Sequence, residues 1–133
     1  MRPKKHNPLG YRSGLEEKVG KLCEENGLHV KYEADSLAFT SPAQKRRYTP
    51  DWKVADNCYI ETKGLFTAAD RKKMLLVLEQ NPLVSILMVF QRNNKLTRVS
   101  KTTYGDWCDK HSIKWCLFSD SRVWLQFIKD NQI

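Results

Sequence analysis

Three residues in the middle of the chain have side chains that suit metal-assisted hydrolysis of a phosphate ester. Asp51 follows Pro50, and the segment Glu61-Thr-Lys63 comes ten residues after that aspartate. Divalent cations such as Mg²⁺ prefer oxygen ligands, and phosphoryl chemistry needs charge stabilised beside a positioned water. Two carboxylates and a lysine at this spacing supply two oxygen donors and one cation near such a water.

Two short strands are expected to carry these side chains. Residues 48–54 and 58–63 read as strands, with turn-forming residues between them, so together they predict a hairpin or tight bend. Side chains alternate along a strand, so Glu61 and Lys63 should share one face while Thr62 projects from the other. The alternative is an exposed hairpin with two ordinary solvated charges, because Glu-x-Lys is common on strand surfaces.

The composition indicates a globular protein that binds an anionic partner. With 133 residues, one compact domain is expected. A net charge of +8 and a pI near 9.4 indicate nucleic acid as the simplest partner. The chain has no apolar run long enough to span a bilayer, so no membrane partner is expected. Its four cysteines are expected to be reduced thiols, and their spacing does not suit a zinc site.

Glu16 has two possible jobs. Ser13-Gly-Leu-Glu16 fits a capping box, in which the serine side chain and the glutamate side chain each bind a free backbone N–H. The helix that it opens should end at Asn26-Gly27. Glu16 also lies beside the apolar stripe of that helix, so it could face a site next to the core.

Several basic segments surround the candidate site. Residues 1–10 are expected to form a flexible basic arm, and residues 11–133 a single folded domain. Residues 40–47 form a polar connection that is either an ordinary loop or an extended bridge to another subunit. Arg12 lies beside the capping box. Two further groups of cations are expected to bind phosphates: Lys45, Arg46 and Arg47 in that connection, and Arg71, Lys72 and Lys73 on the exposed turn of the next helix. For the second group, an ordinary solvated helix face is the alternative.

The remaining elements predict an α/β fold. A helix capped by Thr67 leads to the buried strand 83–90, and this strand–helix–strand unit favours two parallel central strands. Residues 91–101 form a polar basic connection that could include a short strand at 96–99. A short helix from about residue 103, a strand at 113–117 and a last helix at 121–129 complete the chain.

The motifs taken together resemble the phage endonuclease I family, the Holliday-junction-resolving nucleases of short-tailed phages. The resemblance covers roughly residues 11–116, in order and with similar spacings, and its Pro-Asp…Glu-x-Lys pattern is that of restriction-endonuclease-like nucleases. The segments that carry it are Tyr11-Arg-Ser-Gly-Leu-Glu16, Tyr48-Thr-Pro-Asp51, Glu61-Thr-Lys-Gly-Leu65, Asp70-Arg-Lys-Lys73 and Thr103-Tyr-Gly-Asp-Trp-Cys108. It implies a restriction-endonuclease-like core with a mixed sheet flanked by helices, so that residues 11–133 would be a single nuclease domain.

The resemblance also implies a metal site and a dimer. Two Mg²⁺ ions per site are expected, with Mn²⁺ as a substitute. One would be held by Asp51, Glu61 and the main-chain carbonyl of Thr62, and the other by Asp51 and Glu16. Lys63 would orient or activate the attacking water. The family is a strand-exchanged homodimer, so Glu16 would come from one chain and the other catalytic residues from its partner, with residues 40–47 as the bridge.

Branched DNA is thus the expected substrate, in the cytoplasm of a phage-infected host cell or of a bacterium. Two alternatives remain: a duplex-specific or nicking nuclease of the same fold, and a non-catalytic junction-binding protein. The resemblance fades after Cys116, and the chain ends in an apolar helix without a basic tail, which puts C-terminal DNA contacts in doubt.

Overall fold

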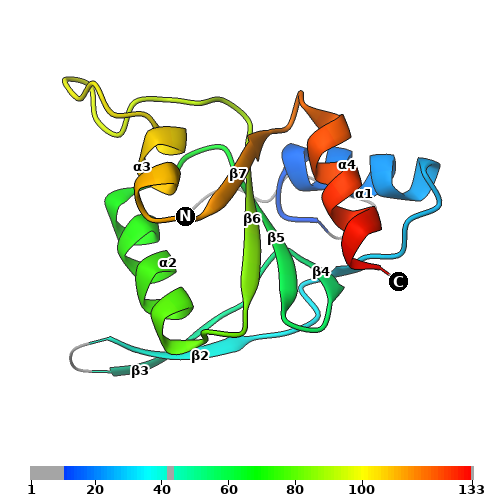
Figure 1. Cartoon of the computed structure of the whole chain (residues 1–133), viewed down its shortest axis with the longest axis horizontal. Coiled ribbons are helices and arrows are strands. Elements are labelled where there is room, and N and C mark those ends of the chain that lie inside the picture. Colours follow the sequence, from blue (N-terminus) through cyan, green and yellow to red (C-terminus); the bar gives the residue numbers. More distant parts are fainter. Residues whose placement is uncertain (1–10, 42–43, 133) are drawn as a thin grey trace.

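A computed structural model describes residues 11–41 and 44–132, which form a mixed sheet flanked by helices (Figure 1). The elements are α1 (Gly14–Glu25), β1 (Lys31–Tyr32), β2 (Leu37–Ser41), β3 (Gln44–Tyr48), β4 (Trp52–Ala55), β5 (Cys58–Lys63), α2 (Ala68–Gln80), β6 (Ser85–Phe90), α3 (Tyr104–Lys110), β7 (Lys114–Leu117) and α4 (Ser121–Asn131). The main sheet has the order β1-β4-β5-β6-β7, and β2 pairs with β3 separately. This confirms the α/β class and the mixed sheet.

The centre of the main sheet is the parallel pair β5 and β6. Nearly all of their residues are buried, because neighbouring strands and helices cover both strands. Parallel neighbours need a crossover connection, and α2 provides it, as the sequence predicts. The register pairs Lys63 with Phe90, so β5 and β6 finish at the same end of the sheet, called here the Lys63 end.

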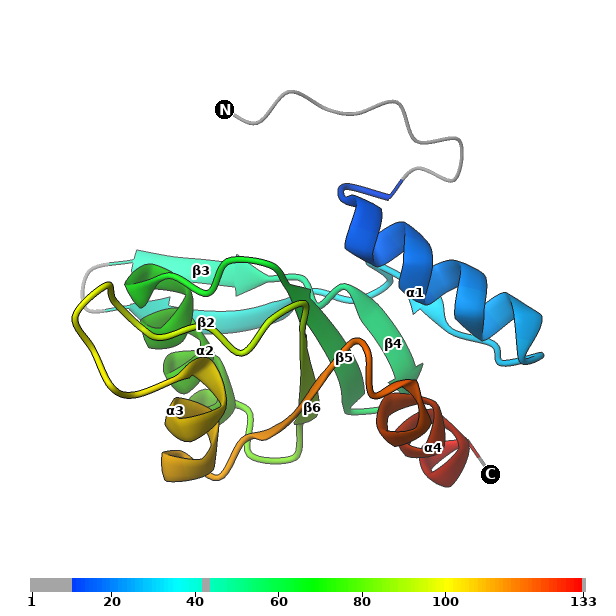
Figure 2. The same ribbon diagram turned by 90° about the horizontal axis from the view of Figure 1, so that it is seen from above.

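Each face of the sheet has its own hydrophobic cluster because side chains alternate along the strands. One cluster joins Tyr48, Tyr59 and Phe90 to α2 and α3. The other joins residues such as Trp52 and Ile60 to α1 and α4. Figure 2 shows α1 and α4 on the side of the molecule away from α2 and α3. A side chain on β5 therefore faces either α2 or α1, according to its position in the strand.

The predicted helix caps are present. Thr67 and Thr103 each form a full capping box with an aspartate three residues later, which fixes where α2 and α3 begin. The Ser13 side chain caps α1 by accepting a hydrogen bond from the backbone N–H of Glu16. The last helix, α4, forms as expected and buries Trp124 and Ile128.

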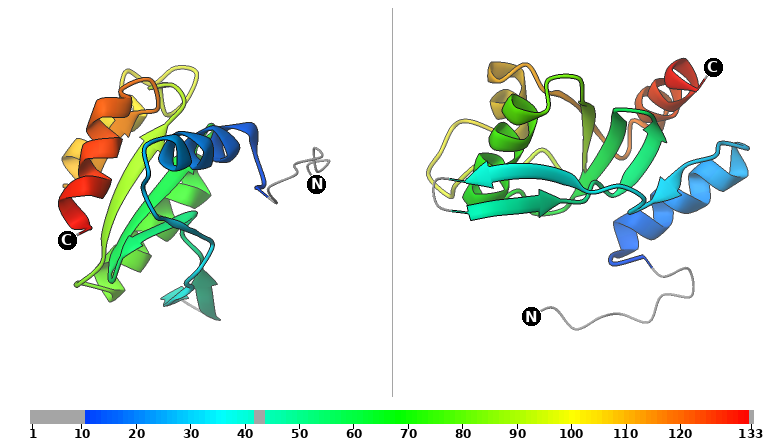
Figure 3. Two further views of the ribbon diagram at one scale, coloured as in Figure 1. Left: turned by 90° about the vertical axis from the view of Figure 1, so that its right-hand side faces the viewer. Right: turned by 90° about the horizontal axis from the view of Figure 1, so that it is seen from below.

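Two predictions about irregular segments were wrong. The segment 40–47 is not a loop: its described residues 40–41 and 44–47 lie in the antiparallel strands β2 and β3, which form the arm seen in Figure 3. This arm packs along α2, where the Gln80 side chain bonds the backbone of Thr40. Residues 96–99 form turns rather than a strand, and only Lys95 makes a β-bridge, to Thr103.

Three further predictions concern the basic arm, membrane-spanning segments and the cysteines. The expected basic arm, residues 1–10, lies outside them. Within residues 11–41 and 44–132, no helix is long and apolar enough to cross a membrane. All four cysteines are buried free thiols, as expected.

Gly105 is a packing constraint that a single substitution can test. A Cβ atom at this position would lie 2.2 Å from Cζ2 of Trp115, whose indole N–H is fixed by Asp109. We expect Gly105→Ala to lower the free energy of unfolding by about 1–3 kcal/mol, the usual cost of overpacking. Chemical denaturation would measure the change.

Gly14→Ala is the matched control, because a Cβ there has no described heavy atom within 4 Å. Alanine in the first turn of α1 should be neutral or stabilising by up to about 1 kcal/mol. An equal loss of stability in both variants would contradict the packing argument.

Candidate active site

The β4–β5 hairpin brings Asp51 to the Lys63 end of the sheet. Asn57 adopts a left-handed φ of 59° in its turn, which asparagine tolerates better than most residues. The register then pairs Trp52 with Ile60, so Asp51 lies beside the last residues of β5. The backbone N–H of Asp51 donates to Oε1 of Glu61 over 3.1 Å. The predicted proximity of these two acidic residues is therefore present in the structure.

Glu61 and Lys63 share the face of the sheet that carries α2. Nζ of Lys63 lies 4.0 Å from Oε2 of Glu61 and 3.9 Å from Oδ1 of Asp70 in the first turn of α2. This agrees with the alternation expected along the strand. It also rules out the exposed-hairpin alternative, because Glu61 is only 3% exposed and the Lys63 side chain 23%.

Tyr48 fixes the carboxylate of Glu61 and was missed by the sequence analysis. Its hydroxyl donates to Oε2 of Glu61 over 2.5 Å, while Asp51 binds the other oxygen. Burial raises the pKa of Glu61 well above its usual range, and the charge of Asp51 raises that pKa further. Burial also raises the pKa of Tyr48, so its phenol keeps the proton that it donates. The only sequence signal was an aromatic residue three positions before Asp51.

Asp51 points to the other face of β5, where Thr62 holds it. Both the backbone N–H and the hydroxyl of Thr62 donate to Oδ2 of Asp51, over 2.9 and 2.7 Å. The sequence analysis expected the main-chain carbonyl of Thr62 to bind metal and did not foresee these two hydrogen bonds to Asp51. Two donors on one oxygen fix the plane of the carboxylate and orient Oδ1.

Glu16 reaches the site from α1, and the predicted capping box is only half formed. Its backbone is capped by Ser13, but its carboxylate does not return to the Ser13 N–H. Oε2 instead accepts from the backbone N–H of Arg12 over 3.1 Å and from the Tyr32 hydroxyl. Burial, followed by the charge of Asp51, raises the pKa of Glu16. Of its two possible roles, capping α1 or facing the candidate site, the side chain faces the candidate site beside Asp51.

Glu33 completes an acidic cluster that the sequence did not reveal. Carboxylate oxygens of Glu16, Glu33 and Asp51 lie within 4.8 Å of one another in the same chain. The backbone N–H of Glu33 donates to the carbonyl of Asp51 over 2.8 Å, and its side chain pairs with Arg12. The sequence spacing between Glu33 and Asp51 matches no metal-ligand pattern. The two residues become neighbours only because β1 pairs with β4. Glu61 lies outside this cluster.

The arrangement suits a divalent cation. Carboxylates this close repel one another, and a bound cation relieves that repulsion. The bonds from Arg12 and Tyr32 fall on Oε2 of Glu16, and those from Thr62 fall on Oδ2 of Asp51, so the second oxygen of each carboxylate is the candidate metal ligand. Oxygen donors without cysteine or histidine match the preference of Mg²⁺ and Mn²⁺.

The predicted DNA-binding cations occupy different settings. Lys45, Arg46 and Arg47 are exposed on β3. The group on α2 is not one solvated turn, because only Lys72 is fully exposed. Arg71 donates to the carbonyl of Phe66 over 2.8 Å, and Nζ of Lys73 lies 5.5 Å from the centre of the Tyr48 ring. These contacts, unforeseen from the sequence, hold two of the three cations near the site.

Fold and site together define an α/β protein whose sheet ends in a carboxylate and lysine centre suited to metal-dependent phosphoester chemistry. Comparisons with known proteins identify the family. The chain matches the phage endonuclease I family over residues 1–133. It is 41% identical over 121 residues to Endonuclease I of Escherichia phage T7, which covers 90% of this chain and 79% of that protein. Endodeoxyribonuclease 1 of Enterobacteria phage T3 is also 41% identical over 121 residues, 78% of its length. The chain belongs to the phage endonuclease I family and is an endonuclease.

The raised pKa of Glu61 predicts how pH affects stability without metal. The folded state binds more protons than the unfolded state between the ordinary value of 4.5 and the raised value. The free energy of unfolding therefore falls as pH rises through that window. Glu61→Gln removes the titrating group, so we expect its Tm in EDTA to fall less than that of the wild type as the pH rises above the ordinary pKa of 4.5.

Glu25→Gln provides the control, because Glu25 is an exposed carboxylate at the end of the same helix that carries Glu16. It should follow the wild-type pH profile. If the Glu61→Gln profile also matched that of the wild type, the buried carboxylate would not be a source of the instability.

Proposed function

We propose that this protein is a metal-dependent, structure-selective DNA endonuclease that resolves four-way junctions and other branched DNA by phosphodiester hydrolysis. Membership of the phage endonuclease I family is the observation that carries the proposal. The buried Glu61, with the partly buried Asp51 and Lys63 beside it at one end of the sheet, supports it, because a chain that only bound junctions would have no need of this costly group. Recognition of branched DNA then rests on shape and phosphate placement rather than on base edges.

Asp51, Glu61 and the carbonyl of Thr62 would hold one Mg²⁺, and Asp51 with Glu16 a second, with Mn²⁺ able to replace either. Oδ1 of Asp51 and Oε1 of Glu16 fit this role, because the bonds from Thr62, Arg12 and Tyr32 fall on the other oxygen of each carboxylate. Glu33 offers a further oxygen beside both. Metal ions at such a site stabilise charge on the attacked phosphate and on the leaving oxygen.

Lys63 would orient the attacking water and balance charge on the scissile phosphate. Oxygens of Asp70 and Glu61 lie 3.9 and 4.0 Å from its ammonium group, which favours a position at the site over one in solvent. Tyr48 and Thr62 keep the carboxylates in place before DNA arrives. The residues are thus arranged in advance for a reaction in which positioning and electrostatics dominate.

The finer architecture that we propose is a restriction-endonuclease-like core in a strand-exchanged homodimer. The β2–β3 arm is the covalent connection between the part that carries Glu16 and the part that carries Asp51. If β2 and β3 separated, a second chain could supply the same contacts to Asp51 that Glu16 makes here within one chain. Residues 40–47 would then form the bridge, and each site would be composite.

Phosphate contacts would come from the exposed cations Lys45, Arg46 and Arg47 and from Arg12, with Arg71, Lys72 and Lys73 next to Lys63. The protein would act in the cytoplasm of the infected bacterial host, where replicating DNA supplies branched substrates.

Cleavage of a labelled immobile four-way junction beside a matched linear duplex tests the activity. We expect paired cuts near the branch point with Mg²⁺ and none in EDTA. Lys63→Met should lower the rate by about 10²–10⁴-fold, because water activation is lost. Asp56→Asn is the control, since Asp56 is 96% exposed in the β4–β5 turn. Equal cutting of the linear duplex would favour a duplex nuclease, and binding without cutting would favour a non-catalytic junction-binding protein.

Mixing two inactive variants tests the composite site. If Glu16 and Lys63 of one site come from different chains, a heterodimer of Glu16→Gln and Lys63→Met has one site with both lesions and one intact site. We expect the mixture, after co-refolding, to recover up to about half of wild-type nicking per heterodimer. Sites formed within single chains would each carry one lesion, so a mixture as inactive as its parents would reject strand exchange.

A further inference from the structure

The segment that connects β6 to α3, residues 91–103, is a basic loop outside the set of cations considered above. It carries four cations and no acidic residue, and nearly all of it is exposed. The cations are Arg92, Lys95, Arg98 and Lys101. None of the ion pairs in the described part of the chain uses any of them, in contrast to Arg12, Lys53 and Lys63. Four fully solvated positive charges without counter-charges leave a local field that attracts a polyanion.

The loop has a defined internal structure. The backbone N–H of Leu96 donates to the carbonyl of Thr102 over 2.8 Å, and Lys95 bridges to Thr103. Ser100 closes the tip by donating to the Thr97 carbonyl over 3.2 Å. Leu96 also packs against the hydrophobic cluster under α2 and α3. The cations are therefore carried on a supported projection.

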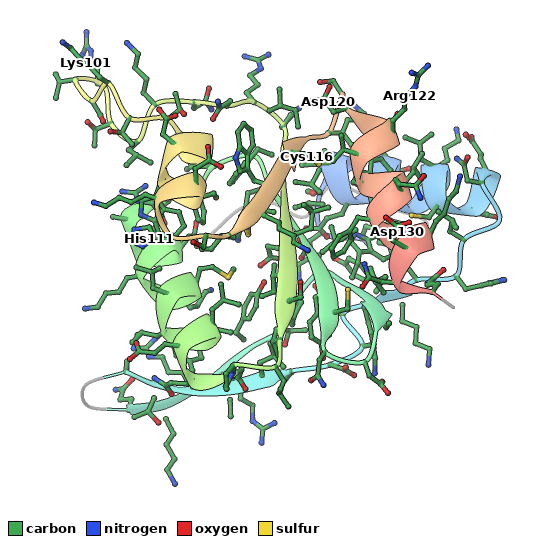
Figure 4. All side chains as sticks on the ribbon, viewed as in Figure 1. Lys101, His111, Cys116, Asp120, Arg122 and Asp130 are labelled. Atoms are coloured by element: carbon green, nitrogen blue, oxygen red, sulfur yellow. The ribbon has the colours of Figure 1, made fainter. Side chains whose placement is uncertain are left out.

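The base of the loop is tied to α3. The Asn93 side chain accepts from the backbone N–H of Gly105 over 2.8 Å, and the Asn94 carbonyl accepts from that of Tyr104. These bonds fix the direction in which the loop leaves the sheet. Figure 4 shows Lys101 at its far tip, extended away from the body of the molecule.

The loop begins at the Lys63 end of the sheet. Phe90 pairs with Lys63, and the next residue, Gln91, donates its backbone N–H to the Lys63 carbonyl over 3.0 Å. Figures 1 and 2 show the loop running outward from there past α3. DNA whose scissile phosphate lay at Lys63 would continue as a duplex beyond the site, and the loop projects outward from this same end.

We propose that residues 91–103 bind the phosphate backbone of a duplex arm outside the cleavage site, with Arg98 and Lys101 as the outermost contacts. This rests on DNA being the substrate of the proposed function. Val99, 91% exposed between the two cations, would pack against deoxyribose rather than bury itself in the protein. The contact has no base readout and adds affinity for long arms whatever their sequence.

The double variant Arg98→Ala, Lys101→Ala tests this through the salt dependence of junction binding in EDTA. Each phosphate contact contributes about 0.9 to the slope of log K against log salt, so two lost contacts should reduce the slope by about 1.8. The ratio of wild-type to variant binding constants should then be roughly tenfold larger at about 50 mM salt than at about 200 mM salt. Arms shortened stepwise should remove the difference, because a short arm no longer reaches the loop.

Arg122→Ala, Lys129→Ala is the matched control, because it removes the same charge from exposed positions on α4. This helix lies on the side of the molecule away from α3 (Figure 2). It should keep the wild-type slope. If the loop variant kept that slope, or if both variants lost it equally, the loop assignment would be overturned. If the loop assignment fails in this way but the wild-type protein still cuts junctions, the proposed function stands. Failure of the loop assignment and failure of the proposed function can therefore be told apart.

Discussion

Burial of neighbouring carboxylates at one end of a sheet is the constraint on which the rest of this structure depends. Glu61 lies almost wholly out of water next to Asp51, and a charged group in that position is costly unless partners compensate it. Tyr48 and the Asp51 backbone donate hydrogen bonds to Glu61, and Thr62 donates to the neighbouring Asp51. Those donors must themselves be held, and the packing around the site holds them.

The two faces of β5 carry different parts of the candidate site. Toward α2, Glu61 is joined to Lys63 and Tyr48, and the Tyr48 ring also supports Lys73. Toward α1, Thr62 fixes Asp51 beside Glu16, which Tyr32 orients. One six-residue strand thus places groups on both of its faces at the point where it ends.

Short-range patterns in the sequence were sufficient for much of this arrangement. The alternation in β5, the turn at Asn57 and the capping box at Thr67 depend on residues a few positions apart, and all formed as predicted. Errors occurred where a distant contact decided the outcome. Residues 40–41 and 44–47 form strands because β2 and β3 pair along α2. The Glu16 side chain does not take its capping role because Tyr32 and Arg12 offer donors.

The sequence by itself determined the α/β class, the central hairpin, the proximity of Asp51 to Glu61 and Lys63, and the family to which the chain belongs. Those properties follow from local periodicity, turn chemistry and motif spacing. Only the tertiary structure decided which groups surround each carboxylate: Tyr48 on Glu61, and Glu33 beside Asp51 and Glu16. These partners come from separate strands whose residues become neighbours only when β1 pairs with β4 and the β2–β3 arm packs on α2, and no sequence spacing encodes that pairing.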